Sequence, residues 1–285
     1  MLKAKRVSDN ADVVATEVAR GPEYRCPECN QLVIIRKGPK IIHHFAHRPD
    51  ASCAYGRGET QAHLRAKLML RDAFRSRGFQ ADVEQVVLSS ESDRRADVLI
   101  WKPNTDRRVA IEVQHSYLSP SDIERRTKAY MAAGVPVIWI GLLKWTQPLN
   151  GDCEPAYRSC GWQDWAQDYN GGHLWLLDLD IAVGKMWRVW FRGGPFSATL
   201  REGPFDIQSL RIKLFKRTSH GRLGPMPSGL SAWLLAPKDD KRPRRPIPNS
   251  PMQSQSSPML SQARPPAFLK ALWRRAARSR GGPRL

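Results

Sequence analysis

The sequence lacks a hydrophobic segment of the length that a membrane-spanning helix needs. Its most continuous apolar run is VPVIWIGLL at residues 135–143, whereas a spanning helix takes about 20 apolar residues. The opening residues, MLKAKRVSDNADVV, contain no apolar core of the kind found in secretory signals. We therefore expect a cytoplasmic protein with no membrane span.

Cysteine is also scarce. The chain has five cysteines, an odd number that does not suit a framework of disulfides. Two of them form the motif Cys26-x-x-Cys29. In an intracellular chain this spacing indicates metal binding rather than a disulfide.

Acidic residues are few relative to basic ones. Asp and Glu number 27 against 46 Lys and Arg, so the formal net charge is +19. The segment from Lys216 to the end holds fifteen Lys and Arg and two Asp, and therefore carries +13 of this excess. Such a charge favours a polyanionic partner, and nucleic acid is the stronger expectation. The alternative is an anionic membrane surface, bound by a basic amphipathic helix near the C-terminus.

Composition and periodicity divide the chain into four segments. The first is small and loop-rich, and the second alternates helix-like and strand-like patterns. The third is rich in tryptophan. The fourth is basic and rich in Pro, Ser and Gln, which predicts a disordered linker and tail. The predicted boundaries are 1–57, 58–148, 149–235 and 236–285.

The second segment predicts helix, three strands, helix and strand. Gly78 and Gly134 are suited to follow the two helices. Ser119 and Pro120 are suited to begin the second one. The expected elements are a helix at 58–77, strands at 81–88, 97–101 and 108–114, a helix from Ser119 to Gly134, and a buried strand at 135–141. This order predicts an α/β fold.

Two acidic residues interrupt apolar, β-favouring runs: Asp97 in ADVLIW and Glu112 in VAIEVQ. A short turn joins these runs, so antiparallel pairing of the two predicted strands would bring the two carboxylates together. Such a pair suits a hard divalent cation, Mg²⁺ or Mn²⁺. The basic neighbours Arg94, Arg95, Arg107 and Arg108 would steer a polyanion such as DNA toward it. The alternative is that Asp97 merely starts a strand and Glu112 is a solvated strand residue.

Glu59, His63 and Lys67 follow one another at intervals of four residues, so they share one face of the first helix. One reading is a solvent-facing stripe of compatible charges. The other is a set of functional side chains at the carboxylate pair. Glu84, in the first predicted strand, is a weaker candidate for the same site.

The N-terminal segment predicts a small zinc-binding module. Cys26 and Cys29 have the spacing of half a structural zinc site. His44, His47 and Cys53 are within reach to complete it, and Cys26, Cys29, His47 and Cys53 would give tetrahedral ligation by three sulfurs and one nitrogen. The alternative is a reduced Cys-x-x-Cys motif without metal.

Five segments together resemble the competence protein CoiA-like family, whose core belongs to the PD-(D/E)xK nuclease superfamily. They are CPEC…HHFAH, ETQAHLRAK, RRADVLI, VAIEVQHSYLS and RRTKAYMAAGVPVIWI. They occur in the family's order and cover roughly residues 20–145. The resemblance implies a restriction-endonuclease-like core at 58–148 behind a zinc-ribbon-like module at 1–57.

The resemblance also implies roles for individual residues. Asp97 and Glu112 would hold the catalytic Mg²⁺ or Mn²⁺, and Glu59 or His63 would assist. Lys67 would bind backbone phosphate. Gln114 stands where the superfamily usually has a lysine, and glutamine offers hydrogen bonds but no positive charge. Glu59-Thr60 replaces the family's usual Glu-Ser.

The function that follows is hydrolysis of phosphodiester bonds in single- or double-stranded DNA during competence, DNA uptake or recombination. Recombination proteins are the expected partners. The main rival is a non-catalytic DNA-binding factor on the same fold, because Gln114 weakens the catalytic reading.

Overall fold

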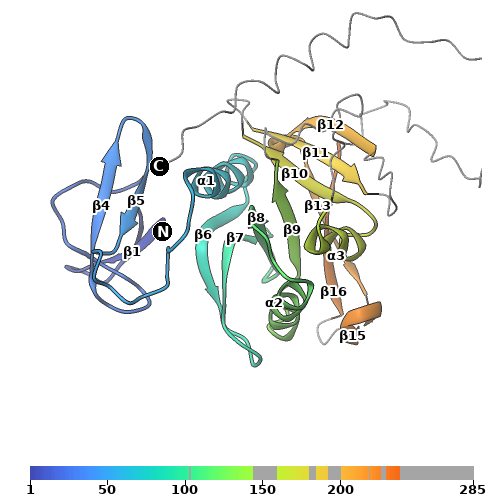
Figure 1. Ribbon diagram of the computed structural model, residues 1–285, viewed down its shortest axis with the longest axis horizontal. Helices are drawn as coiled ribbons and strands as arrows, with labels where there is room; N and C mark the ends of the chain where they lie inside the picture. The colour runs from blue at the N-terminus through green and yellow to red at the C-terminus, as the bar shows by residue number, and fades with distance from the viewer. Residues whose placement is uncertain are drawn as a thin grey trace, which may run out of the picture. The chain divides into compact units, whose positions relative to one another are not determined.

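The computed structural model describes residues 1–102, 104–143, 159–179, 184–191, 200–217, 219–225 and 229–237 (Figure 1). The α/β class expected from the sequence is confirmed. Residues Met1–Asp240 form one compact unit, and the three inner boundaries predicted from composition stay predictions. Apart from residues 236 and 237, the predicted linker and tail at 236–285 lie outside the described residues.

The N-terminal segment contains an antiparallel sheet with strand order β2-β1-β3-β4-β5. Its core is small and includes Tyr24 and Phe45, whose ring centroids lie 5.0 Å apart. The strands are β1 (Lys3–Arg6), β2 (Asp12–Val14), β3 (Tyr24–Arg25), β4 (Leu32–Gly38) and β5 (Ile41–Ala46). This segment is therefore more regular than its loop-like composition predicted.

A second sheet of seven strands has the order β12-β11-β10-β9-β8-β7-β6. β6, β7 and β8 form the predicted antiparallel meander, whereas β8, β9 and β10 are parallel neighbours. Its strands are β6 (Gln80–Val87), β7 (Arg94–Trp101), β8 (Arg108–Gln114), β9 (Val137–Leu142), β10 (Leu174–Asp178), β11 (Lys185–Trp190) and β12 (Leu200–Asp206).

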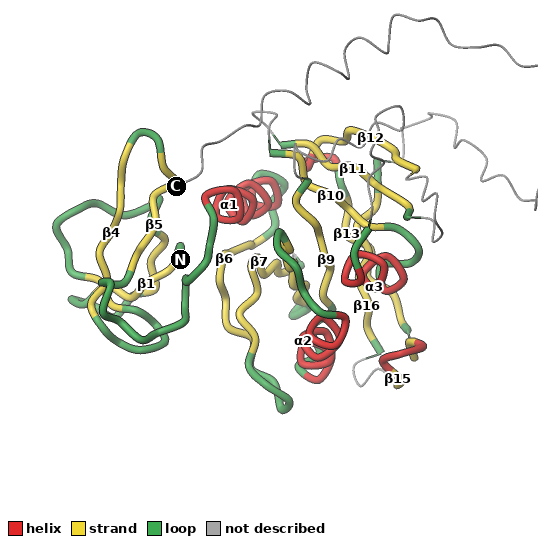
Figure 2. Tube along the Cα trace, in the orientation of Figure 1, coloured by secondary structure: helices red, strands yellow, loops and turns green. Residues whose placement is uncertain are grey.

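Helices cover both faces of this sheet (Figure 2). α1 (Gln61–Arg75) packs on the face that presents Val98, Ile111 and Val113. α2 (Pro120–Ala132) and α3 (Gly161–Tyr169) pack on the other face. None of the described helices is long and apolar enough to span a membrane.

The sequence signals for the helix ends have physical counterparts. α1 begins three residues later than predicted because the side chain of Thr60 caps it, accepting the backbone N–H of His63 at 3.1 Å. Ser119 caps α2 in the same way through Asp122 N, as predicted. Gly134 directly follows the α2 cap with φ 69°, a conformation that glycine adopts without strain.

The tryptophan-rich region extends the central sheet and adds a separate two-stranded antiparallel sheet. β13 (Arg211–Lys216) pairs with β16 (Leu230–Leu235). Trp162, Trp165 and Trp175 are buried in the two cores that flank the central sheet. The remaining short elements are β14 (Ser219–His220), β15 (Gly224–Pro225) and the 3₁₀ turns η1 (Ile207–Ser209) and η2 (Gly221–Leu223).

Candidate functional site

The candidate site forms where the pairing of β7 with its two neighbours, β6 and β8, is interrupted. β7 and β8 pair from Trp101 and Arg108 to Val98 and Ile111, and the ladder ends one step before Asp97 and Glu112. Instead, Asp97 Oδ2 accepts the backbone N–H of Val113 at 2.8 Å. On the other side, Glu84 lies opposite Asp97 and has a φ of 51°. At this break the side chain of Asp97 therefore departs from the regular alternation of side chains between the two faces of the sheet.

The Asp97 carboxylate lies against α1. Its Oδ2 is 3.2 Å from His63 Nε2, and its Oδ1 is 3.4 Å from Lys67 Nζ. Lys67 also pairs with Glu59 and lies 2.8 Å from Glu84 Oε1. We call Glu59, His63, Lys67, Glu84, Asp97 and Glu112 the carboxylate site.

Burial corrects one reading of the helix stripe. Glu59, His63 and Lys67 do share one face of α1, but Lys67 is 2 % exposed and His63 9 %. The solvent-facing alternative is therefore wrong. The contact with DNA phosphate expected of Lys67 does not fit this burial either, because three carboxylates hold its ammonium group inside the protein.

The charges in this cluster stabilise one another. Burial by itself raises the pKa of a carboxyl group, but His63 and Lys67 outweigh it and lower the pKa of Asp97 to about 2. Burial disfavours a charged imidazole, yet Asp97 and Glu59 raise the pKa of His63 to about 9. The pKa of Lys67 is also raised despite burial, by Glu84, Asp97 and Glu59. His63 and Lys67 are therefore both cationic at neutral pH.

Glu112 lies toward α2, on the other face of the sheet. The Tyr130 hydroxyl donates a hydrogen bond to its carboxylate, and Arg126 Nη1 is 4.0 Å from it. Glu112 is 5 % exposed, so the alternative of a solvated strand residue is wrong. Burial and the negative charge of Asp97 raise the pKa of Glu112 to about 7. The two carboxylates thus interact, although different helices supply their partners.

Gln114 follows Glu112 on the same strand and is also buried. Its side-chain Nε2 donates to the carbonyl of Ser116 at 2.8 Å. This bond fixes the amide at the end of β8, next to the break in the ladder. The charge that a lysine would bring to this position is instead brought near Asp97 by Lys67.

The residue types of the carboxylate site fit a divalent cation. Mg²⁺ is commonly held by one or two carboxylates and keeps several waters, so the predicted pair of Asp97 and Glu112 would be sufficient in number. Burial and repulsion from Asp97 raise the pKa of Glu112, and a dication would relieve the repulsion. In the described part of the chain, only the cysteine–histidine cluster brings three or more potential ligand atoms within 4.8 Å of one another.

The N-terminal segment contacts this site by donating hydrogen bonds to Glu84 of β6. The backbone N–H groups of Leu2 and Lys3 donate to Glu84 Oε2 at 2.8 and 3.0 Å, and the Tyr55 hydroxyl donates to the same oxygen. Glu84 is 2 % exposed. These partners lie 29 to 82 residues away in the sequence, so no local pattern signalled them.

Arg95 forms a second link between the two segments. Its guanidinium stacks over the Tyr55 ring at 4.2 Å and donates to the carbonyl of Glu84 at 3.1 Å. It also pairs with Glu28, which lies inside the Cys-x-x-Cys turn. Arg94 lies near Glu112 and lowers the pKa of that carboxyl group, against the larger effect of burial. The predicted role of both arginines in DNA binding stays a prediction.

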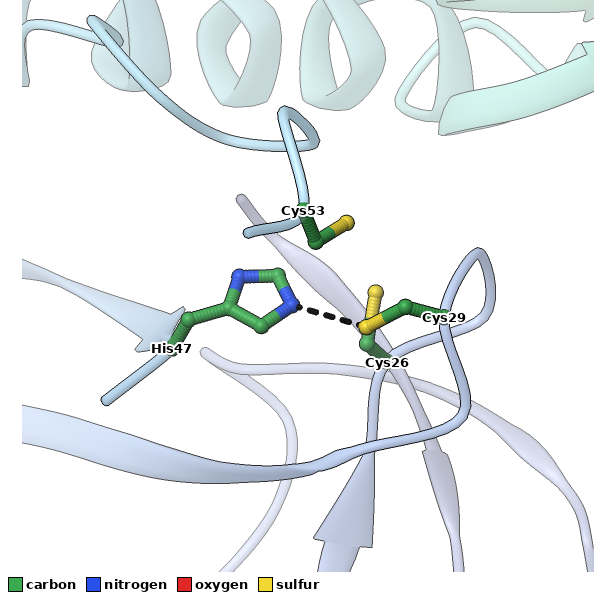
Figure 3. Close-up of side chains that lie close together, drawn as sticks. All are labelled: Cys26, Cys29, His47 and Cys53. Carbon is green, nitrogen blue, oxygen red and sulfur yellow. Dashed lines mark hydrogen bonds between the residues drawn. The ribbon is translucent and has the colours of Figure 1, made fainter. Parts of the chain in front are cut away.

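Cys26, Cys29, His47 and Cys53 form a compact cluster (Figure 3). Their ligand atoms all lie within 4.8 Å of one another, and Cys29 Sγ is 3.3 Å from His47 Nε2. Three sulfurs and one imidazole at this separation match a tetrahedral zinc site, whose metal–sulfur bonds are about 2.3 Å. His44 is outside the cluster, and its Nδ1 lies 2.7 Å from the carbonyl of Ile42.

Chain geometry explains how the four ligands meet. Cys26 and Cys29 flank the turn between β3 and β4, His47 directly follows β5, and Cys53 lies in the loop before α1. Burial and nearby positive charge, including that of Arg57, lower the pKa of His47. The neutral imidazole that metal binding requires is thereby favoured.

Comparisons with known proteins assign both segments. Residues 9–56 match the family model "Competence protein CoiA, N-terminal domain", and residues 59–150 match "Competence protein CoiA, nuclease-like domain". Neither the curated proteins nor the solved structures match the chain. The two matches are adjacent and in the order of the two segments described above, and both are to domains of the competence protein CoiA family.

Proposed function

We propose that this protein hydrolyses phosphodiester bonds in DNA with a divalent metal held by Asp97 and Glu112. One observation carries the proposal: within a CoiA nuclease-like domain, the half-buried Asp97 and the buried Glu112 lie on neighbouring strands, one step beyond the last paired residues of β7 and β8. The order α1, β6, β7, β8, α2, β9 supports a restriction-endonuclease-like core.

The residues around the carboxylates have distinct proposed tasks. A bound Mg²⁺ or Mn²⁺ would activate water and neutralise charge that develops on the scissile phosphate. His63, protonated at neutral pH, orients Asp97 through their 3.2 Å contact. Lys67 supplies the positive charge that Gln114 lacks, and Glu59 holds Lys67 in place. The Gln114 amide would form a hydrogen bond to water or phosphate after it releases its present bond to Ser116.

We further propose that residues 1–57 are a structural zinc module. Cys26, Cys29, His47 and Cys53 leave no coordination position for substrate, which is typical of structural sites. The module would brace the carboxylate site through Tyr55 and Arg95. The basic tail, outside the described residues, would add non-specific phosphate contacts. Recombination proteins are the proposed partners in the cell.

A second candidate function is DNA binding without cleavage. It is favoured by Gln114 and by the ion pairs of Lys67, which already compensate the carboxylates of Glu59, Glu84 and Asp97. In this reading, competence would depend on the protein as a DNA-binding factor.

Cleavage assays decide between the two. Purified full-length protein is incubated with linear, nicked and single-stranded DNA in the presence of Mg²⁺, Mn²⁺ or neither. The proposal predicts metal-dependent cleavage that disappears in Asp97→Ala and Glu112→Ala while DNA binding remains. Asp106→Ala, an exposed acidic residue of the β7–β8 turn, is the matched control and should cleave normally. Cleavage retained in both site variants would refute the catalytic assignment, and no cleavage by wild type would favour the second candidate.

A further inference from the structure

A cavity of about 530 Å³ lies beside the carboxylate site, within the N-terminal segment and the start of α1. Its volume is in the range of sites that hold ligands of nucleotide size, which is about 300–1,000 Å³. Polar and charged side chains from β4, β5, the loop after β5 and α1 line it, including Arg36, His44, Arg48, Arg57, Glu59 and Gln61.

Three arginines at this cavity have no acidic partner. Within the described residues, no carboxylate lies within ion-pair distance of Arg36, Arg48 or Arg57, although Arg57 donates to the carbonyl of Ala51. Arginines elsewhere differ: Arg71 lies 2.8 Å from Glu17, and Arg188 pairs with Glu202. Uncompensated guanidinium groups around one concavity indicate an anionic ligand.

The local structure gathers these charges on one side. Arg36 of β4 pairs in register with His44 of β5, so their side chains project from the same face of the hairpin. Arg48 and Arg57 both lie in the loop between β5 and α1. Glu59 also lines the cavity, but His63 and Lys67 compensate its charge and lower its pKa despite burial. The cavity is therefore cationic in balance.

We propose that this cavity binds the phosphate groups of a nucleic-acid strand and leads that strand to the carboxylate site. Glu59 connects the two places, because it lines the cavity and pairs with Lys67, which contacts Asp97. Planar guanidinium groups match phosphate oxygens in bidentate geometry, which suits Arg36, Arg48 and Arg57 for this task. The choice of DNA as the ligand rests on the proposed function.

The test is binding of a fluorescein-labelled single-stranded oligonucleotide to the full chain, without added Mg²⁺ or Mn²⁺, over a range of salt concentrations. Each of Arg36→Gln, Arg48→Gln and Arg57→Gln should weaken binding several-fold. The triple variant should weaken it about 100-fold at low salt. It should also flatten the plot of log K against log salt by roughly 0.7 per lost phosphate contact.

Arg125→Gln is the matched control. Arg125 is exposed on α2 and pairs with Asp122, so this change removes the same charge at a different place. It should leave affinity within twofold of wild type. Arg36→Lys, which keeps the charge, should recover part of the affinity. Zinc content and thermal unfolding of each variant show whether the N-terminal segment stays folded.

The outcomes separate this inference from the proposed function. A folded triple variant that binds DNA like Arg125→Gln, with an unchanged salt slope, overturns the cavity assignment even if wild type cleaves DNA. Weaker binding in the arginine variants supports the cavity assignment even if wild type never cleaves, in which case the proposed chemistry fails alone.

Discussion

The two candidate metal-binding regions are organised in different ways. The cysteine–histidine cluster gathers four ligand atoms within 4.8 Å from one short segment, residues 26–53. The carboxylate site takes its members from a loop, a helix and three strands, and Lys67 and His63 compensate its charges. The first region has the ligand geometry of a metal site, whereas in the second region Lys67 and His63 form ion pairs with the carboxylates.

This difference predicts different costs when each region is altered. A cluster in a module with a small apolar core depends on its metal for folding. A buried ion-pair network depends on charge balance, so its response depends on which charge is removed. The following experiments test that contrast, from the largest expected effect to the smallest.

Cys26→Ser should have the largest effect. Structural zinc contributes on the order of 10 kcal/mol of apparent binding free energy in small zinc domains, so the variant should lose its zinc and the cooperative folding of residues 1–57. Metal analysis and hydrogen exchange measure both. Cys160→Ser is the control, because Cys160 lies outside the cluster, and it should keep about one zinc per chain. Zinc-free wild type, purified without chelators, would contradict the account.

Lys67→Met should come next. Removing the cation leaves Glu59, Glu84 and Asp97 without their shared partner, and breaking a buried ion pair in this way costs about 3–5 kcal/mol. Chemical denaturation measures the loss. Lys128→Met removes an exposed lysine that pairs with Glu124 at 2.9 Å, and should change stability by less than about 0.5 kcal/mol. Added Mn²⁺ should recover part of the stability of Lys67→Met alone. Equal effects of the two variants would show that Lys67 does not balance the site.

Asp97→Asn and Glu112→Gln should change stability in opposite directions at pH 7. The pKa of Asp97 is lowered to about 2, so its charged form stabilises the fold above its unfolded pKa, and this contribution is lost as pH falls toward 2. Its removal should cost about 2 kcal/mol. The pKa of Glu112 is raised to about 7, so its charged form destabilises the fold increasingly as pH rises from its unfolded pKa toward 7. Glu112→Gln should therefore stabilise the metal-free protein by up to about 3 kcal/mol.

Unfolding of both variants at pH 5 and pH 7.5 provides the control. The gain from Glu112→Gln should shrink at pH 5, where Glu112 is protonated in the folded protein. The cost of Asp97→Asn should be similar at both values, because both lie above the pKa range in which Asp97 changes charge. Destabilisation by Glu112→Gln at pH 7.5 would be the opposite of this prediction.

Tyr55→Phe should have the smallest effect. It removes the hydroxyl that donates to Glu84 but keeps the ring beneath Arg95, so the expected cost is about 1 kcal/mol. Tyr117→Phe, an exposed hydroxyl, is the control. If Tyr55→Phe also lowers cleavage without changing zinc content, the N-terminal segment supports the carboxylate site as proposed.

The sequence was most informative where local patterns determine structure. Thr60 and Ser119 mark helix starts, and alternating apolar runs mark the strands. The zinc ligands follow from short loop spacings. The sequence was least informative where contacts are distant in the chain. The burial of Lys67 needs Glu59, Glu84 and Asp97 together, and the partners of Glu84 include Leu2 and Tyr55. The strand break at Asp97 also has no signal in the alternation of ADVLIW.

The most direct test of the central claim is a titration of zinc-loaded protein with Mn²⁺, followed by electron paramagnetic resonance. The account predicts one Mn²⁺ site in wild type that is lost in both Asp97→Ala and Glu112→Ala, with zinc content and Asp106→Ala binding unchanged. Mn²⁺ binding of equal affinity in wild type and both variants would contradict the claim that these two carboxylates hold the metal.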